Sequence, residues 1–192
     1  MWLNFFTPDL FASAIRMATP LALAAIGGTI CERSGVVNIA LEGIMLIGAF
    51  FGVVVTLATG NVYLGLVGAI LAGILLSGIH AFASVTLRMD QVVSGTALNI
   101  LALGLTGFLM EVLYGHAGAT NGIAHKIGPV FNFAAPGGGF LATVWVWIDQ
   151  VLLSYTPIVY VAIIIAIVAQ WAMYRTRWGL RLRALGEHPR AA

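Results

Sequence analysis

The sequence predicts an all-α protein: a polytopic transmembrane helical bundle of about five spans, with a broken or re-entrant segment near residues 31–43. Composition is the first reason, because 60% of the 192 residues are hydrophobic and only 8% are charged. Soluble domains typically carry about 25% charged residues. The second reason is the mean hydropathy of +1.00. The third is the content of 23 glycines, since small residues let membrane helices approach closely.

Five apolar runs are long enough to cross a bilayer. A hydrocarbon core of about 30 Å needs about 20 apolar residues of helix. The runs that meet this requirement are residues 10–30, 39–59, 63–87, 92–113 and 157–174. In the third run small residues recur at every fourth position and so share one helix face; they are Gly65, Ala69, Gly73, Ser77 and Ala81. This spacing predicts a face that packs closely against a neighbouring helix.

The stretch between the fourth and fifth runs, residues 114–150, is rich in Gly, Ala, Asn and Pro. It predicts an extramembrane loop with an interfacial helix near residues 141–148. Orientation follows from the basic residues, which accumulate on the cytoplasmic side. If the C-terminal tail is cytoplasmic and the N-terminus outside, seven of nine basic residues fall inside: Arg33, Arg88, Arg175, Arg177, Arg181, Arg183 and Arg190. We therefore expect this orientation for a multi-pass protein.

A polar block, CERSGVVNIALEG at residues 31–43, interrupts the apolar pattern after the first run. Charges at membrane depth are costly and usually face a bundle interior or a partner. Asn38 and Glu42 are four residues apart and would share one helix face. We expect both to face inward in a broken helix of the kind that builds transport sites. For Glu32 and Arg33, a plain cytoplasmic turn in water remains an equal alternative.

The fourth run begins with a second polar group of residues, Ser94, Thr96 and Asn99, with Thr106 further along nearly the same face. An asparagine inside a membrane helix needs a hydrogen-bond partner. One interpretation is a polar stripe along a translocation pathway. The other is an interhelical hydrogen bond, which contributes about 0.6 kcal/mol in measured membrane proteins.

Enzyme, cofactor and nucleic-acid functions find no support in the sequence. The single cysteine, Cys31, excludes an intramolecular disulfide and a cysteine-cluster metal site. No nucleophile elbow, zinc-protease helix or phosphate-binding loop is present. The basic residues lie at the ends of apolar runs rather than on a solvated face, which argues against nucleic acid. We expect no catalytic residue, no metal and no cofactor, and a lipid bilayer as the surrounding phase.

The C-terminal tail, residues 175–192, is basic and amphipathic. It could bind anionic lipid headgroups. Gly179, Gly186 and Pro189 instead indicate short helices with defined turns, as in an element that docks on a cytoplasmic partner. Both interpretations stay open on the residues alone.

Three motifs, in this order along the chain, carry a resemblance to a known family. They are ERSGVVNIALEG at 32–43, SGTALNILALG at 94–104 and TRWGLRLRALGEHPRAA at 176–192. The first resembles a signature of ABC importer permeases of the branched-chain amino acid/simple-sugar superfamily. All three are most similar to the branch for nucleosides and unconventional simple sugars. In that branch the third motif is the cytoplasmic coupling segment that contacts the ATPase.

The resemblance implies a permease subunit of an ATP-binding cassette importer in a bacterial-type inner/plasma membrane, moving a nucleoside or simple sugar inward by alternating access. Its partners would be cytoplasmic ABC ATPase subunits, a second permease subunit and an extracytoplasmic substrate-binding (lipo)protein. Residues 1–174 would be the N-terminal part of the transmembrane permease domain, and 175–192 an incomplete coupling segment. Pathway residues would be Asn38, Glu42, Ser94, Thr96 and Asn99; ATPase-coupling residues would be Gly179, Arg181, Arg183, Gly186, Glu187 and Pro189.

Permeases of this family continue for several more helices, so the resemblance also leads us to expect that the chain is a C-terminally truncated piece. Two other functions remain as alternatives. An ion-coupled secondary transporter would need an ion gradient and no ATPase. A non-transporting membrane assembly subunit would need neither.

Overall fold

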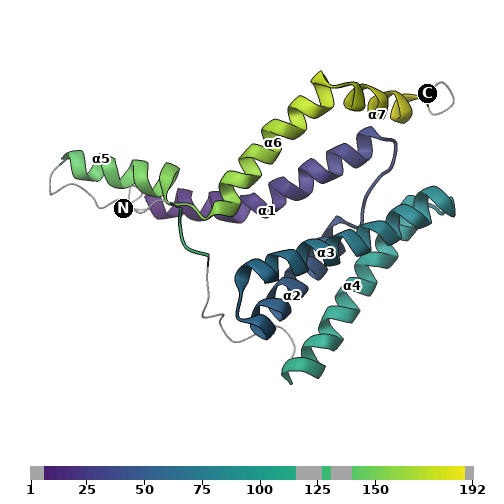
Figure 1. Ribbon diagram of the computed structural model, residues 1–192, viewed down its shortest axis with the longest axis horizontal. Helices are drawn as coiled ribbons and strands as arrows, with labels where there is room; N and C mark the ends of the chain where they lie inside the picture. The colour runs from purple at the N-terminus through teal and green to yellow at the C-terminus, as the bar shows by residue number, and fades with distance from the viewer. Residues whose placement is uncertain (1–6, 116–126, 131–139, 189–192) are drawn as a thin grey trace. The chain divides into compact units, whose positions relative to one another are not determined.

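The computed structural model describes residues 7–115, 127–130 and 140–188. Over these residues the chain is helical and contains no strand. Its elements in chain order are α1 (Pro8–Arg33), α2 (Leu41–Thr59), α3 (Val62–Ala81), the π-helical turn η2 (Phe82–Thr86), α4 (Gln91–Tyr114), α5 (Phe140–Ile148), the π-helical turn η3 (Asp149–Leu153), α6 (Pro157–Arg175) and α7 (Arg177–Glu187). Figure 1 shows these elements along the chain.

Five of these helices are long and apolar enough to cross a membrane: α1, α2, α3 with η2, α4 and α6. This confirms the all-α polytopic bundle and its five spans. A helix is present where the sequence predicted an interfacial one near residues 141–148: it is α5, which is only 9 residues long. Large apolar side chains remain exposed on every candidate span, as on Met17, Leu75, Ile100 and Ile167. Such surfaces suit lipid or neighbouring helices.

The polar block at residues 31–43 is divided among three pieces of backbone. Cys31–Arg33 complete α1, residues 34–40 are not α-helical, and α2 begins at Leu41. We call residues 34–40 the linker segment. The expectation that Asn38 and Glu42 share a helix face is therefore wrong, because Asn38 lies in the linker segment and Glu42 in the first turn of α2. The break itself lies where the sequence predicted it.

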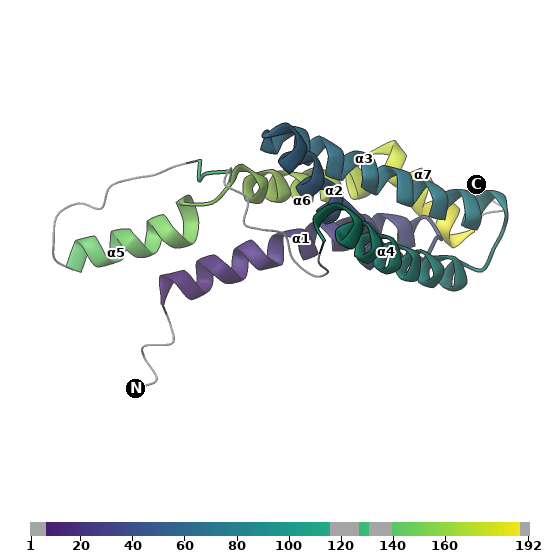
Figure 2. The same ribbon diagram turned by 90° about the horizontal axis from the view of Figure 1, so that it is seen from below.

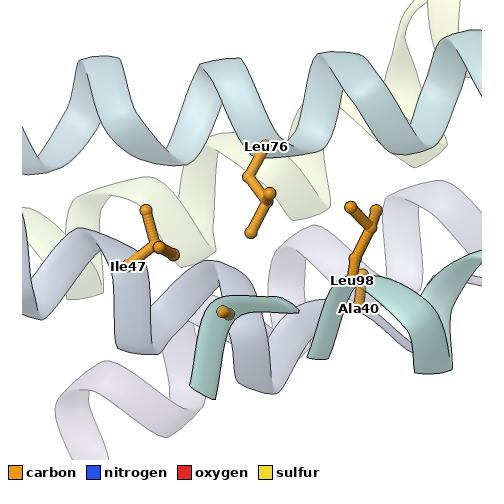
Figure 3. Close-up of a cluster of buried hydrophobic side chains, with 5 residues drawn as sticks. Ala40, Ile47, Leu76 and Leu98 are labelled. Atoms are coloured by element: carbon orange, nitrogen blue, oxygen red, sulfur yellow. The ribbon is translucent and has the colours of Figure 1, made fainter. Parts of the chain in front are cut away.

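The chain forms two compact units, and each is described by itself. One unit comprises Gly28–Lys126 and Arg181–Ala192. In it α2 contacts both α3 and α4, and the two views of the ribbon show the three helices together (Figures 1 and 2). Their buried core is a cluster of small and branched side chains, Ala40, Ile47, Leu76, Leu98 and Ala102, four of which are labelled in Figure 3.

The small-residue face of α3 packs against α2, as the four-residue spacing predicted. A Cβ added at Gly65 would collide with the hydroxyl of Thr56 and lie 2.6 Å from the carbonyl oxygen of Gly52. A Cβ added at Gly48 would lie 3.5 Å from the carbonyl oxygen of Ala69, and a Cβ added at Gly52 would lie 3.3 Å from the Cβ of Ala69. The two helix backbones are thus closer together than larger side chains would allow.

Local capping sets the ends of these helices. The Asp90 carboxylate accepts hydrogen bonds from the backbone N–H groups of Val92 and Val93 at 2.8 and 3.0 Å, which starts α4. The Asn61 side chain accepts from the N–H of Tyr63 at 2.9 Å and starts α3. In α1, Pro8 stands at the first position and Arg33 in the last turn, where a cation complements the helix dipole.

The other unit comprises Met1–Gly27 and Ile127–Leu180. Its buried cluster joins Ala12 of α1 to Tyr155 and Val159 at the start of α6. The rings of Phe11 and Trp147 lie 5.8 Å apart between centroids, which brings α5 to the N-terminal part of α1. The N–H of Val130 donates to the carbonyl oxygen of Tyr155 at 2.9 Å and fixes the chain before α6.

Candidate functional site

The linker segment is held by side chains from two helices. Gln91 of α4 accepts a hydrogen bond from the N–H of Val37 at 2.7 Å. The Nε2 atom of His80 in α3 lies 3.4 Å from the carbonyl oxygen of Val37. The Nδ2 atom of Asn99 in α4 donates to the carbonyl oxygen of Ile39 at 3.0 Å. Non-helical backbone at membrane depth is stable when protein groups satisfy it in this way.

Asn99 also caps the start of α2. Its Oδ1 atom accepts from the N–H of Gly43 at 2.8 Å, one of the amides that has no partner within the helix. The close approach depends on glycine on both helices. A Cβ at Gly43 would lie 3.0 Å from the Cα of Asn99, and a Cβ at Gly95 would lie 3.1 Å from the backbone nitrogen of Ala40. Asn99 thus makes two hydrogen bonds to the backbone of the broken region.

Asn38 and Ser94 lie in the same region. The Asn38 side chain is half-buried and accepts from the N–H of Ala40 at 3.1 Å, which shapes the entry into α2. Ser94 is buried, and its hydroxyl lies 3.1 Å from Nδ1 of His80. A carbonyl can only accept, so Nε2 of a neutral His80 carries the proton and Nδ1 accepts from Ser94. The Val37 carbonyl therefore fixes which ring nitrogen carries the proton, and the Ser94 hydroxyl, which can donate or accept, adapts to the other nitrogen.

Two of the predicted pathway residues do not join this group. Thr96 is exposed, and its hydroxyl donates to the carbonyl oxygen of Val92 in its own helix. Glu42 is exposed in the first turn of α2, where a carboxylate complements the positive end of the helix dipole. The structure thus brings Asn38, Ser94 and Asn99 together around the linker segment and leaves these two on open surface.

Sequence reasoning missed His80 and Gln91. His80 is only 3% exposed and is 43 residues from Val37 in the sequence. It lies within the run that was interpreted as a packing face, yet an ionisable residue inside an apolar span is itself a signal. Gln91 follows the N-cap residue Asp90 as the first residue of α4, where the sequence indicates only the start of a helix. Its contact with Val37, 54 residues away, has no local sequence signature.

In the described part of the tail, residues 175–188, one short helix, α7, follows α6. Thr176 starts it: its hydroxyl accepts from the N–H of Gly179 at 3.2 Å and donates to the carbonyl oxygen of Ala172 at 2.6 Å. Gly179 lies so close to α6 that an added Cβ would collide with the carbonyl oxygens of Ala172 and Met173. Gly179 therefore permits the close contact between the first turn of α7 and the end of α6.

The C-terminal half of α7 belongs to the same unit as the linker segment. A Cβ at Gly186 would collide with the carbonyl oxygen of Arg33 and lie 3.1 Å from the backbone nitrogen of Gly35. Arg181 and Glu187 are exposed, and Arg183 is half-buried. Pro189, the last of the predicted coupling residues, lies outside the described residues.

The side chains of this site mainly form hydrogen bonds to backbone groups of the linker segment and the start of α2. Among the described residues no group of three or more His, Cys, Asp or Glu side chains could hold a metal ion. A separate cavity of about 330 Å³ lies in the other unit, lined by Arg16, Thr19, Pro20, Leu23, Thr156, Ile158 and Val159. The Arg16 side chain reaches back to Ser13 and to the carbonyl oxygen of Ala12 in its own helix.

Known proteins resemble this chain over most of its length. The guanosine ABC transporter permease protein NupQ of Bacillus subtilis is 43% identical over 184 residues, covering 91% of this chain and 54% of NupQ. The nucleoside ABC transporter permease protein NupC of Lactococcus lactis subsp. cremoris is 40% identical, covering 95% of this chain and 57% of NupC. The putative glucose ABC transporter permease protein TsgC13 of Haloferax volcanii is 34% identical, covering 97% and 54%.

The chain spans about half the length of the curated relatives it matches. No solved structure gives a significant match. A family model described as branched-chain amino acid transport system / permease component matches residues 10–192, which include all five candidate spans except the first two residues of α1. This chain therefore belongs to the branched-chain amino acid transport system / permease component family.

Proposed function

We propose that this chain is a membrane-spanning part of an ATP-binding cassette importer and that the importer moves a nucleoside inward by alternating access. What supports this most is the identity of 43% and 40% to two nucleoside permeases over more than nine-tenths of the chain. The putative glucose permease is less similar, at 34%. Nucleosides are therefore the first substrate class to test, and simple sugars the second.

In this proposal residues 1–174 form the membrane domain, and residues 175–192 form the cytoplasmic coupling segment. The N-terminus lies outside and the tail inside, in agreement with the seven basic residues that the orientation places on the cytoplasmic side. ATP hydrolysis occurs in separate cytoplasmic ATPase subunits. A second permease subunit completes the pathway, and an extracytoplasmic binding protein delivers the substrate.

The coupling residues are proposed to bind the ATPase through the exposed side of α7, where Arg181 and Glu187 are accessible. Gly179 and Gly186 allow the two close backbone contacts of the helix, and the half-buried Arg183 is proposed to take part in docking. Asn38, Ser94 and Asn99 are proposed to border the inner end of the pathway, and Glu42 and Thr96 to face a second permease subunit or the pathway itself. Their exposure is compatible with either contact.

Copurification tests the docking half of the proposal. The protein is expressed with the ABC ATPase subunits of its importer, extracted in mild detergent and captured by an affinity tag. The ATPase should be recovered with it, and Glu187→Arg should reduce the recovery because it reverses the charge of an exposed docking residue.

The matched control is Glu111→Arg, the same change at an exposed carboxylate near the end of α4. In the proposed topology Glu111 faces the opposite side of the membrane and should leave the recovery unchanged. An ATPase that never copurifies, or that binds equally well to both variants, would contradict the proposed docking.

A further inference from the structure

The last turn of α7 rests directly on the backbone of the polar block. Gly186 leaves no room for a side chain above the carbonyl oxygen of Arg33, and a Cβ at Gly35 would lie 3.3 Å from the Cα of Gly186. Gly35 has a φ of +86°, which side-chain-bearing residues rarely adopt. The end of α7 and the polar block therefore meet backbone to backbone. Gly186 is required there because there is no space for a side chain, and Gly35 because of its positive φ.

Polar side chains also bind the backbone of the same segment. His80 contacts the carbonyl oxygen of Val37, and Gln91 accepts from the N–H of Val37. The Nε2 atom of Gln91 also lies 3.5 Å from the carbonyl oxygen of Gly35. Gly35, which lies against Gly186, is thus two residues before Val37, which side chains of α3 and α4 contact.

The contacts continue into the membrane helices. His80 belongs to α3, and Ser94, which contacts its ring, belongs to α4 together with Gln91 and Asn99. Asn99 binds both ends of the entry into α2, at Ile39 and Gly43. If Gly186 moves, it therefore pushes on the linker segment, whose backbone is hydrogen-bonded to α3 and α4 and continues into α2.

We propose that the linker segment is the surface through which the coupling segment moves the membrane helices, and that His80 is a positioning residue that keeps this surface in shape. The inference rests on the proposed function, because it concerns how work done at the coupling segment reaches the spans. Coupling and the shape of the linker segment are measured separately.

Substitutions of His80 separate its two contacts. Glutamine places an amide nitrogen near the position of Nε2 and can still donate to the Val37 carbonyl. Asparagine places its amide near Nδ1 and keeps only the contact with Ser94. If His80 acts through Val37, His80→Gln should retain function and His80→Asn should lose it; a role in filling space alone would make the two equally harmful.

The shape of the linker segment is measured by amide hydrogen exchange of the protein in lipid nanodiscs. His80→Asn and Gly186→Ala should each raise the exchange rate of amides in residues 36–41 roughly tenfold, since an overpacked or unsatisfied contact has about that cost. Gly107→Ala is the control, because a Cβ there meets nothing within 4 Å. Unchanged exchange in both variants would overturn the proposed positioning.

Coupling is measured as substrate transported per ATP hydrolysed by the assembled importer, with guanosine as the substrate. His80→Asn and Gly186→Ala should lower this ratio severalfold while ATPase copurification is retained, and the double variant should fall no further than the worse single variant. An unchanged ratio in both single variants, or additive losses in the double variant, would refute the inference. A wild-type assembly that neither binds an ATPase nor transports would refute the proposed function instead, while the exchange result still reports on the contact itself.

Discussion

The Asn99 side chain makes two hydrogen bonds to backbone at the start of α2. Its amide group has one acceptor and two donors, and it uses them on Gly43 and Ile39, which flank the first turn of α2. Asn99 is half-buried, at the point where glycines bring α2 and α4 together. Its geometry matches the interhelical hydrogen bond, one of the two interpretations that the sequence left open.

Asn99→Ala should therefore lower the free energy of unfolding by about 1.6 kcal/mol, the sum of a lost cap (about 1 kcal/mol) and a lost interhelical bond (about 0.6 kcal/mol). The measurement is reversible denaturation of the purified protein in mixed micelles. Thr96→Ala is the matched control one turn earlier in α4, because the Thr96 hydroxyl bonds only to its own helix. Equal losses from both variants would contradict the capping role of Asn99.

At the scale of single residues, the sequence identified the polar side chains of the site but not the groups that they contact. Asn38, Ser94 and Asn99 were found because polar side chains stand out in apolar sequence. The role of His80 depends on a contact 43 residues away, and nothing local encodes it. Glu42 was expected to share a face with Asn38, but the helix starts only at Leu41, because Asn38 and Asn99 cap its first turn there.

The α2–α3 pair is the element-level feature that depends most on small side chains. Gly65 faces Gly52 and Thr56 with no space for a methyl group. Gly65→Ala should lower the free energy of unfolding by about 1–3 kcal/mol, because overpacking moves backbone that is already in contact. Gly78→Ala in the same helix adds its Cβ to open space and should cause no loss.

The readout is the fraction of protein that stays folded and monodisperse in detergent across a temperature series. A Gly65→Ala variant as stable as wild type, or a Gly78→Ala variant that is equally damaged, would show that α2 and α3 do not pack as described.

Elements were more predictable than contacts. The five spans follow from runs of apolar residues, and all their observed ends lie within three residues of the prediction, those of the third span within one. There η2 continues α3 only to Thr86, and the helix ends before Arg88, whose φ of +54° is unusual for a residue other than glycine. α1 extends past Ile30 to Arg33 because a helix does not end where hydrophobicity ends, and a cation suits its last turn.

At the scale of the whole molecule, the proposed orientation makes opposite predictions for the two ends of α3. In a Cys31→Ser background, Asn61→Cys should react with a membrane-impermeant maleimide added to intact cells. Arg88→Cys should react only after the membrane is permeabilised. Both positions are exposed in the structure, so accessibility reports on the side of the membrane. The reverse pattern would invert the topology and place α7 on the wrong side for an ATPase.

The central claim is ATP-driven nucleoside import, and uptake into proteoliposomes tests it most directly. The assembled importer is reconstituted with ATP inside, and the binding protein and radiolabelled guanosine are added outside. We predict uptake that requires hydrolysable ATP and persists when ionophores collapse proton and sodium gradients. Uptake that follows an imposed ion gradient and ignores ATP would contradict the claim and favour a secondary transporter, and no uptake of any nucleoside or sugar would favour a non-transporting assembly subunit.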